Sequence, residues 1–339
     1  RRTRVPLHGS MDLTYRCNNR CVHCYAGPPS GAGGRARAEL ATPQVLSILD
    51  QVAEAGCLFF LITGGEPLAR EDFPEVYRHA KRRGLIVTVF TNGTRVDDAV
   101  LSLFEEFPPL GVEISIYGAT AGAHDRVTGV EGSFDLSMRA VRRLRDRGIR
   151  VVLKTILMTL NRGEIPGMER LAQEFGHTFR FDAIVFPRLN GDRSPLGVRA
   201  SAEQAVEGEL ANARRAEEWR QYAGSRSGKL AASDKLYTCG AGVACFHIDA
   251  YGNLYPCLMA RSAGYNLAQG AFLEGWRNVV PRIREEKAPP GFVCNQCEKK
   301  IYCSACPATF ALEGGAESGY YAFMCEVADR RATALRAGA

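Results

Sequence analysis

Three cysteines near the start of the sequence constrain this chain more than any other feature. Cys17, Cys21 and Cys24 are separated by three and two residues, so one short loop can bring their thiolates to a single small object. Structural zinc sites and fully protein-ligated iron–sulfur cubes both take four ligands. Three thiolates therefore favour a [4Fe–4S] cluster that leaves one iron open, because soft thiolates stabilise such clusters. The alternatives are a zinc knuckle or three unrelated core cysteines.

The spacing Cys-x3-Cys-x2-Cys resembles the signature of the radical S-adenosylmethionine (SAM) enzymes, and the sequence Gly-Gly-Glu-Pro at 64–67 is similar to that family's second motif. The resemblance implies that the open iron chelates the amino and carboxylate groups of SAM. Reductive cleavage of the sulfonium then gives methionine and a 5′-deoxyadenosyl radical, which removes a hydrogen atom from the substrate. The cofactor contacts that the resemblance implies are His23, Tyr25, Gly64, Gly65, Glu66, Pro67, Asn92 and Ser115.

The Gly-Gly-Glu-Pro segment has a physical role of its own. Glycines let the backbone approach a ligand closely, and Pro67 fixes the turn. Glu66 supplies an acceptor for an ammonium group. The alternative is a tight turn between a strand and a helix, with a solvated glutamate.

Length and composition set broad limits. The 339 residues are enough for two domains with a sizeable core. No apolar run approaches the length of a transmembrane helix, and the start lacks the apolar centre of a secretory signal, so we expect a cytoplasmic protein. The net charge of +6 is a mild excess that a solvated surface explains, and we expect neither a nucleic-acid nor a membrane partner.

Short strand-like runs alternate with longer helical runs, which predicts a parallel sheet. Strands are expected over residues 11–15, 58–63, 85–90, 112–117, 151–157 and 178–186. Helices are expected over residues 42–55, 72–83, 96–106, 134–147 and 163–175. Six such units fit either an open doubly wound sheet or a partial barrel. The resemblance implies the partial (β/α)6 barrel of the radical SAM core.

Alternation along the strands predicts which side chains face the barrel interior. In the strand at 112–117, the apolar positions would pack under the helices and Glu113, Ser115 and Tyr117 would point inward. Active sites of such barrels form at the carboxyl ends of the strands. The interior candidates, with no acid or base assigned among them, are Glu113, Tyr117, Lys154, Asp182 and Arg188. The alternative for each is a hydrogen bond between a strand end and a loop.

Eight of the twelve cysteines lie in the last third of the chain. Four of them, at 294, 297, 303 and 306, could form a zinc site, but eight thiolates also match two fully ligated [4Fe–4S] clusters. The layout resembles the SPASM domain, which carries two auxiliary clusters. The resemblance implies one cluster on Cys239, Cys245, Cys257 and Cys306. It implies the other on Cys294, Cys297, Cys303 and Cys325. We expect a barrel over residues 1–190, a bridging helix region over 191–235 and the SPASM domain over 236–335.

The expected function is oxidation of a ribosomally made peptide by a radical SAM enzyme with three [4Fe–4S] clusters, because a fully ligated auxiliary cluster can accept the electron that an oxidised product must lose. Sulfatase-maturing relatives carry an aspartate where Leu258 stands here. Relatives that act on tetrapyrroles remain an alternative, as does a zinc-binding adaptor with a degenerate barrel. No leader-binding domain is evident before Met11, so a peptide substrate would need a separate leader-binding protein, a surface of the barrel or a segment beyond the given sequence. Flavodoxin or ferredoxin is the expected electron donor.

Overall fold

The computed structural model describes residues 4–26, 38–226, 233–262, 264–304, 306–316, 319 and 321–337. Within these residues one sheet of nine strands runs in the order β6-β5-β4-β3-β2-β1-β7-β8-β9. The barrel strands are all parallel, and they are β1 (His8–Thr14), β2 (Phe59–Gly64), β3 (Ile86–Thr91), β4 (Gly111–Ser115), β5 (Val151–Ile156) and β6 (Thr178–Asp182). The sheet continues past β1 into the cysteine-rich region through β7 (Cys245–Ile248), β8 (Asn253–Tyr255) and β9 (Tyr265–Asn266).

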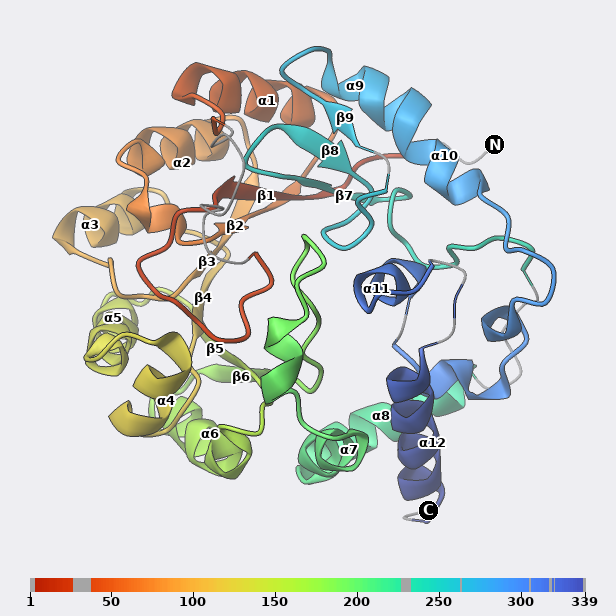
Figure 1. The fold of residues 1–339 in the computed structure, drawn as a ribbon. Helices are drawn as coiled ribbons and strands as arrows, with labels where there is room; N and C mark the ends of the chain where they lie inside the picture. The colour runs from red at the N-terminus through yellow and green to blue at the C-terminus, as the bar shows by residue number, and fades with distance from the viewer. Residues whose placement is uncertain are drawn as a thin grey trace.

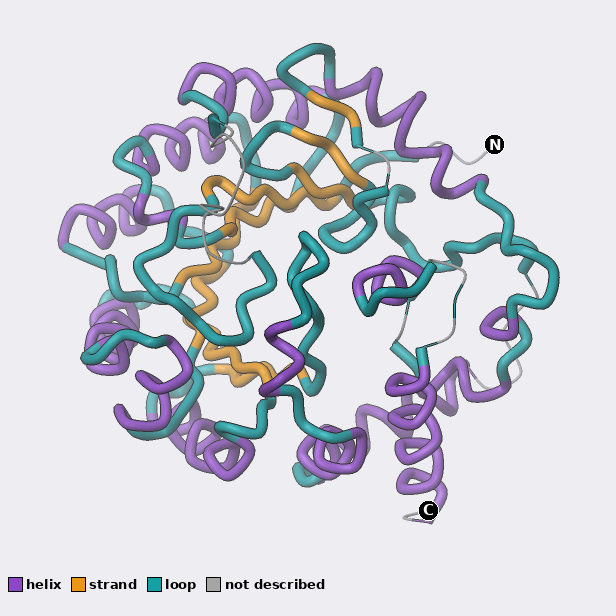
Figure 2. The backbone as a smooth tube through the Cα atoms, viewed as in Figure 1, coloured by secondary structure: helices purple, strands orange, loops and turns teal. Residues whose placement is uncertain are grey.

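The barrel helices all lie outside the curved sheet, and the strands follow an open arc (Figures 1 and 2). These helices are α1 (Thr42–Glu54), α2 (Phe73–Arg82), α3 (Asp98–Glu106), α4 (Ala121–Thr128), α5 (Ser133–Asp146) and α6 (Ile165–Glu174). Because one face alone of the sheet carries helices, the architecture is the predicted partial barrel and not a doubly wound sheet. All six predicted strands and all five predicted helices are present, with ends that differ by a few residues.

The apolar face of the strands builds the main core. Val112, Ile114 and Ile116 are each 0% exposed and pack in one cluster with the helices, as the alternation predicts. The opposite face carries polar side chains toward the interior of the arc. This division places Glu113 and Ser115 where the sequence predicts them.

Three local predictions need correction. Thr42, which precedes Pro43, is predicted from the sequence as the N-cap of α1, but the cap is Ala41 and the Thr42 hydroxyl donates to Asp72. Helix α4 was not expected, although the Thr120 side chain caps its start and Gly129, with φ +66°, ends it. Strand β6 ends at Asp182, four residues before the expected end at 186, because the chain leaves the sheet there.

The polar helical pattern over residues 201–222 predicts one helix in the bridging region, but the structure contains two. They are α7 (Ala202–Leu210) and α8 (Ala213–Arg226). The break falls at Asn212, whose Oδ1 accepts from the backbone N–H groups of Arg214 and Arg215 and so starts a new helix. Helix α7 packs against α12 (Ala322–Ala337) near the end of the chain.

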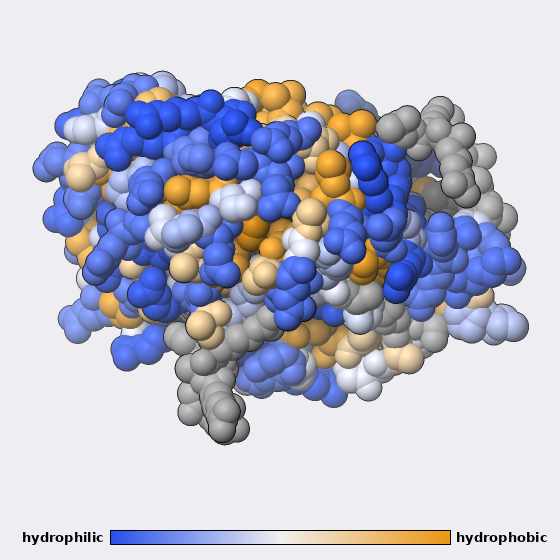
Figure 3. All heavy atoms as spheres, turned by 90° about the horizontal axis from the view of Figure 1, so that it is seen from above, coloured by the Kyte–Doolittle hydropathy of each residue, from blue (hydrophilic) through white to orange (hydrophobic). Residues whose placement is uncertain are grey.

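The remaining elements are short. Helices of the cysteine-rich region are α9 (Phe272–Glu274), the π-helix η4 (Gly275–Val279), α10 (Val280–Glu285) and α11 (Pro307–Leu312). Single 3-10 turns are η1 (Pro67–Ala69), η2 (Arg162–Glu164), η3 (Ser194–Val198), η5 (Val293–Asn295) and η6 (Glu298–Tyr302). Seen from above, polar and charged residues cover much of the visible surface, with apolar groups between them (Figure 3). None of the described helices combines the length and apolarity that crossing a membrane requires.

Candidate functional site

The cysteine loop follows β1 and is tied to the barrel by backbone hydrogen bonds. Arg20 N–H donates to the Thr128 carbonyl over 2.8 Å, and Val22 N–H donates to the Val127 carbonyl over 3.1 Å. Leu189 N–H, in the segment after β6, donates to the carbonyl of Tyr25 over 2.9 Å. The unexpected helix α4 is therefore one of the supports of the loop.

The three thiols of the loop lie close enough to interact electrostatically. Burial, and then the neighbouring Cys24 and Cys17 thiols, raise the pKa of the Cys21 thiol. Burial also raises the pKa of Cys17. Three soft donors on one loop fit a [4Fe–4S] cluster with one open iron. Each thiolate that holds a [4Fe–4S] cluster binds a different iron atom, so the three sulfur atoms need not meet at one point. Among the described residues, no three His, Cys, Asp or Glu side chains converge to hold a single metal ion.

Gly64 and Gly65 lie directly against the chain that enters the cysteine loop. A Cβ on Gly64, whose φ is +128°, would lie 2.3 Å from the Thr14 carbonyl oxygen, and one on Gly65 would lie 2.4 Å from that of Arg16. Both positions require glycine, because neither backbone can move away without breaking the hydrogen bond from Gly65 N–H to Thr14, 2.7 Å long. The close approach that the structure displays is thus to the protein's own backbone.

Glu66 is fully enclosed, so the alternative of a solvated glutamate is wrong. It is 0% exposed, and its carboxylate accepts from the Thr91 hydroxyl over 2.7 Å, from Asn92 N–H over 2.7 Å and from Leu68 N–H over 3.1 Å. Burial raises the pKa of Glu66, and these hydrogen bonds act in the opposite direction. Glu66 therefore joins the turn after β2, which continues into Pro67, to the end of β3. Its contact with a ligand stays a prediction.

Asn92 connects this turn to the cysteine loop. Its Nδ2 donates to Asn18 Oδ1 over 3.0 Å and lies 3.9 Å from Cys17 Sγ. Its carbonyl accepts from the Ser137 hydroxyl over 2.7 Å. Asn18 was not selected from its sequence pattern, because this contact joins residues 74 positions apart.

A second set of predicted cofactor contacts and interior candidates lies near the end of the cysteine loop: His23, Tyr25, Ser115 and Tyr117. The rings of His23 and Tyr117 lie 4.6 Å apart, and Tyr117 also interacts with Ser115. Burial lowers the pKa of His23 to about 4, so its ring is neutral. Its Nδ1 is buried without a hydrogen-bond partner among the described residues, which fits a bound group beside the loop. Burial raises the pKa of Tyr25, which interacts with Cys24.

The far side of the barrel interior carries a second polar group. Arg180 Nη1 donates to both carboxylate oxygens of Glu113, over 2.8 and 3.0 Å. Lys154 Nζ lies 3.0 Å from the ring centroid of Phe90, and burial lowers the pKa of Lys154 to about 7. Asp182 interacts electrostatically with Lys154. The sequence missed Arg180 and Phe90, although Arg180 shares the face of Asp182 on β6 at a spacing of two.

Two of the interior candidates have different surroundings. Tyr117 packs between the rings of His23 and His124, 4.6 and 5.7 Å away, under the cysteine loop. Arg188 lies in the segment after β6, with its Nε 3.4 Å from Asp192 Oδ2. Neither contact involves the group around Lys154.

The eight C-terminal cysteines fall into two groups by their electrostatic interactions. In the first group, Cys257 interacts with Cys239, and Cys245 and Cys306 each interact with both of these residues. The second group is made up of Cys294, Cys297, Cys303 and Cys325. These are the two sets that the SPASM resemblance implies, and ligation of clusters by them stays a prediction.

A cavity of about 910 Å³ lies among these cysteines, large enough for a sizeable bound group. Its lining includes Cys239, Cys294, Cys297, Cys303, Cys306 and Cys325. Burial raises the pKa of Cys294 and Cys306, as expected for half-buried thiols. The soft donors and the space between them fit iron–sulfur clusters.

Comparison with known proteins gives consistent matches. Residues 11–174 match the family described as the radical SAM superfamily. The mycofactocin maturase MftC of Mycobacterium tuberculosis is 30% identical over 312 residues, which cover 86% of this chain and 76% of that protein. The AdoMet-dependent heme synthase of Methanosarcina barkeri is 27% identical over 326 residues, covering 90% of this chain and 92% of that protein. The structure of Streptococcus suis SuiB bound to S-adenosylmethionine is similar in fold, with a TM-score of 0.71, 15% identity and coverage of 94% and 77%.

Proposed function

Because this chain belongs to the radical SAM superfamily, we propose that it uses SAM to oxidise a ribosomally made peptide, forming a cross-link or another side-chain modification. The observation that carries the proposal is the division of the C-terminal cysteines into two groups of four. An oxidised product loses one electron and one proton beyond the hydrogen atom that is abstracted, and two further clusters offer acceptors for the electron. Similarity to a PqqA peptide cyclase over 87% of the chain supports a peptide substrate.

The cofactors of the family are SAM and a [4Fe–4S] cluster, and we propose two further [4Fe–4S] clusters here. The cluster that binds SAM would be held by Cys17, Cys21 and Cys24. The first auxiliary cluster would be held by Cys239, Cys245, Cys257 and Cys306. The second would be held by Cys294, Cys297, Cys303 and Cys325. When bound, these groups supply the electron that splits the sulfonium of SAM and sites that accept one electron from the substrate.

The protein's own residues hold the loop and shape the interior. Glu66 fixes Asn92, and Asn92 in turn contacts Asn18 beside Cys17. On the far side, Lys154 and the Glu113–Arg180 pair present charge to the interior. Because Glu113 is already engaged by Arg180, we propose Lys154 as the interior group that is most available to a substrate.

The domain boundaries and partners belong to the same proposal. The barrel would span residues 1–190, the bridge 191–235 and the SPASM domain 236–335. A separate leader-binding protein or a surface of the barrel would present the peptide, and flavodoxin or ferredoxin would supply electrons.

A tetrapyrrole substrate is the second candidate. The similarity to a heme synthase, which extends over 92% of that protein, favours it specifically. Both candidates share the same cofactor chemistry and differ in what occupies the interior of the barrel.

The deciding experiment compares two probes under anaerobic conditions with SAM and dithionite. One is a synthetic copy of any short peptide that the neighbouring genes encode, and the other is iron-coproporphyrin III. The proposal expects the peptide to raise 5′-deoxyadenosine formation and to lose the mass of two hydrogen atoms. Turnover of the porphyrin without change in the peptide would instead establish the second candidate. A variant with Cys17, Cys21 and Cys24 changed to alanine serves as control and should form no 5′-deoxyadenosine.

A further inference from the structure

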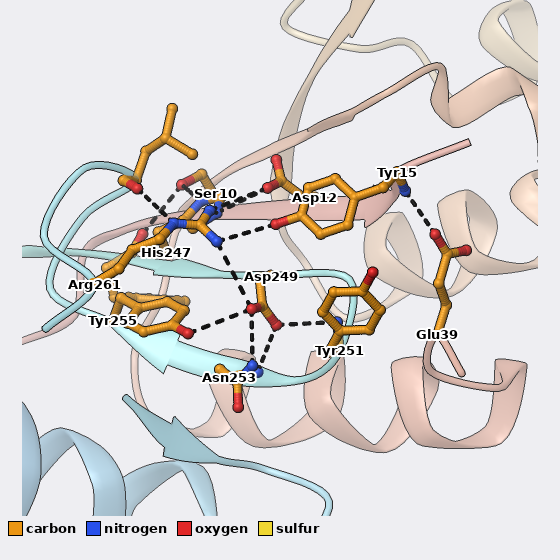
Figure 4. A network of polar contacts seen from close by, with 12 residues as sticks. Ser10, Asp12, Tyr15, Glu39, His247, Asp249, Tyr251, Asn253, Tyr255 and Arg261 are labelled. Atoms are coloured by element: carbon orange, nitrogen blue, oxygen red, sulfur yellow. Dashed lines mark hydrogen bonds and ion pairs between the residues drawn. The ribbon is translucent and has the colours of Figure 1, made fainter. Parts of the chain in front are cut away.

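A buried polar network lies where the barrel meets the cysteine-rich region (Figure 4). Strands β1 and β7 pair in parallel with Met11 opposite Ile248, so Asp12 and Asp249 follow at the same edge of the sheet. Asp12 is 0% exposed and Asp249 is 3% exposed. Two carboxylates buried at one edge require a cation nearby.

Arg261 supplies this cation. Its Nη2 lies 3.4 Å from Asp12 Oδ2, and its Nη1 lies 3.8 Å from Asp249 Oδ2. His247 Nε2 also lies 3.2 Å from Asp12 Oδ2, and its Nδ1 lies 2.9 Å from the Ser10 hydroxyl. Burial alone would raise the pKa of Asp12, but His247 and Arg261 together hold it below its usual range.

The same guanidinium connects two cysteine loops. Its Nη1 donates to the Tyr15 hydroxyl over 3.1 Å, and its Nε donates to the Leu258 carbonyl over 2.8 Å. Tyr15 stands two residues before Cys17, and Leu258 directly follows Cys257. A planar fork of N–H groups can make these contacts simultaneously, whereas the single ammonium of a lysine cannot reproduce their directions.

We infer that Arg261 is a positioning residue through which the loop of the first auxiliary cysteine group sets the geometry of the Cys17 loop. Arg261 acts through Tyr15, whose backbone N–H is held separately by Glu39 over 2.7 Å. Without Arg261, the Tyr15 hydroxyl loses the hydrogen bond that ties it to the Cys257 loop, while the backbone beside Tyr15 stays bonded to Glu39, Gly65 and Glu66. The inference rests on the proposed cluster positions and not on the identity of the substrate.

The test uses the full chain with its clusters reconstituted and SAM as the probe. We would compare Tyr15→Phe, Arg261→Gln and the double variant by iron content, SAM affinity and the electron paramagnetic resonance of the reduced protein with and without SAM. Each single change should weaken SAM binding about tenfold, as expected for one hydrogen bond to a charged group. Each should also alter the SAM-dependent spectrum and speed hydrogen exchange of the amides at 15–24. The double variant should bind SAM no more weakly than Arg261→Gln, because Arg261→Gln already breaks the contact that Tyr15→Phe removes.

Two further variants keep the result interpretable. Arg215→Gln is the matched control, because Arg215 also pairs with a carboxylate, Glu169, and its side chain is 15% exposed against 19% for Arg261. It should leave SAM affinity and the spectrum unchanged. Arg261→Lys is the second variant, to be used if Arg261→Gln loses iron, because a lysine keeps a positive charge between the carboxylates. It should retain the iron and still show the weaker SAM binding.

Additive effects of the two changes would overturn the inference, and so would a Tyr15→Phe protein with the SAM affinity and spectrum of the wild type. Failure of the proposed function has a different signature. A wild-type protein that holds only about four irons would refute the auxiliary clusters themselves, whatever the variants do.

Discussion

The backbone N–H of Asn92 donates to Oε2 of Glu66 over 2.7 Å, which joins the turn after β2 to the end of β3. Two more donors, from Thr91 and Leu68, meet the other carboxylate oxygen. A carboxylate offers acceptors alone, so it matches three donors that converge from separate elements. The contacts also fix Asn92 beside the cysteine loop.

Glu66→Gln should therefore reduce both stability and SAM affinity. The amide places an N–H group against one of the three donors, which leaves a buried hydrogen bond unmade at a cost of about 1–3 kcal/mol in the free energy of unfolding. Urea unfolding and calorimetric SAM titration would measure the two effects. The exposed neighbour Glu71 provides the control, and Glu71→Gln should change neither quantity. A Glu66→Gln protein with wild-type stability and SAM affinity would contradict the assigned role.

Iron content tests the three cysteine groups. Reconstituted protein should carry about twelve irons, and replacing Cys17, Cys21 and Cys24 by alanine should leave about eight. Cys57→Ala is the control, because the buried Cys57 thiol lies 3.5 Å from the Phe59 carbonyl and belongs to none of the groups. It should retain all the iron. Full iron content in the triple variant would refute the assignment of that loop.

The sequence predicted those parts of the structure that depend on local spacing. The cysteine loop, the alternation of strands with helices and the inward position of Glu113 all follow from residues close together in the chain. Helix α4 was missed even though the signals at Thr120 and Gly129 were present. The break at Asn212 was missed likewise, because a polar helical pattern continues on both sides.

What the sequence could not predict depends on pairing between distant strands. Arg180 meets Glu113 across 67 positions, and His247 meets Asp12 across 235. The second contact exists because the four-residue strand β7 pairs beside β1, and a strand so short has no distinctive pattern. The burial of Glu66 also depends on residues distant in the chain, because Thr91 and Asn92 at the end of β3 donate to it. The sequence of the turn alone could not predict this burial.

Lys154 should make stability depend on pH. Burial lowers its pKa from an ordinary 10.5 to about 7, so between these values the unfolded chain holds a proton that the folded chain lacks. The free energy of unfolding should then rise with pH across this range, and the cost of charging this half-buried amine is fully present below pH 7. Lys154→Met removes that cost. Its melting temperature should exceed that of the wild type by a few degrees at neutral pH, and the difference should shrink toward pH 10.

A surface lysine provides the comparison. Lys287 is 73% exposed in its side chain and pairs with Asp234 over 3.2 Å, so Lys287→Met should shift the melting temperature little at any pH. A Lys154→Met difference that is absent at neutral pH, or that grows with pH, would show that the charge on Lys154 does not destabilise the fold.

Cys325→Ala should separate cleavage of SAM from oxidation of the substrate. Cys325 lies in the first turn of α12, in the second auxiliary group, and the groups that would bind and cleave SAM are all in the barrel. The variant should therefore still form 5′-deoxyadenosine with dithionite, while modified product falls much further. Both are measured by mass spectrometry in one anaerobic reaction, with Cys57→Ala as a control that keeps both. If product falls only in proportion to 5′-deoxyadenosine, the second group has no separate part in oxidation. Full product in a protein shown to lack that cluster would mean that the electron leaves by another route.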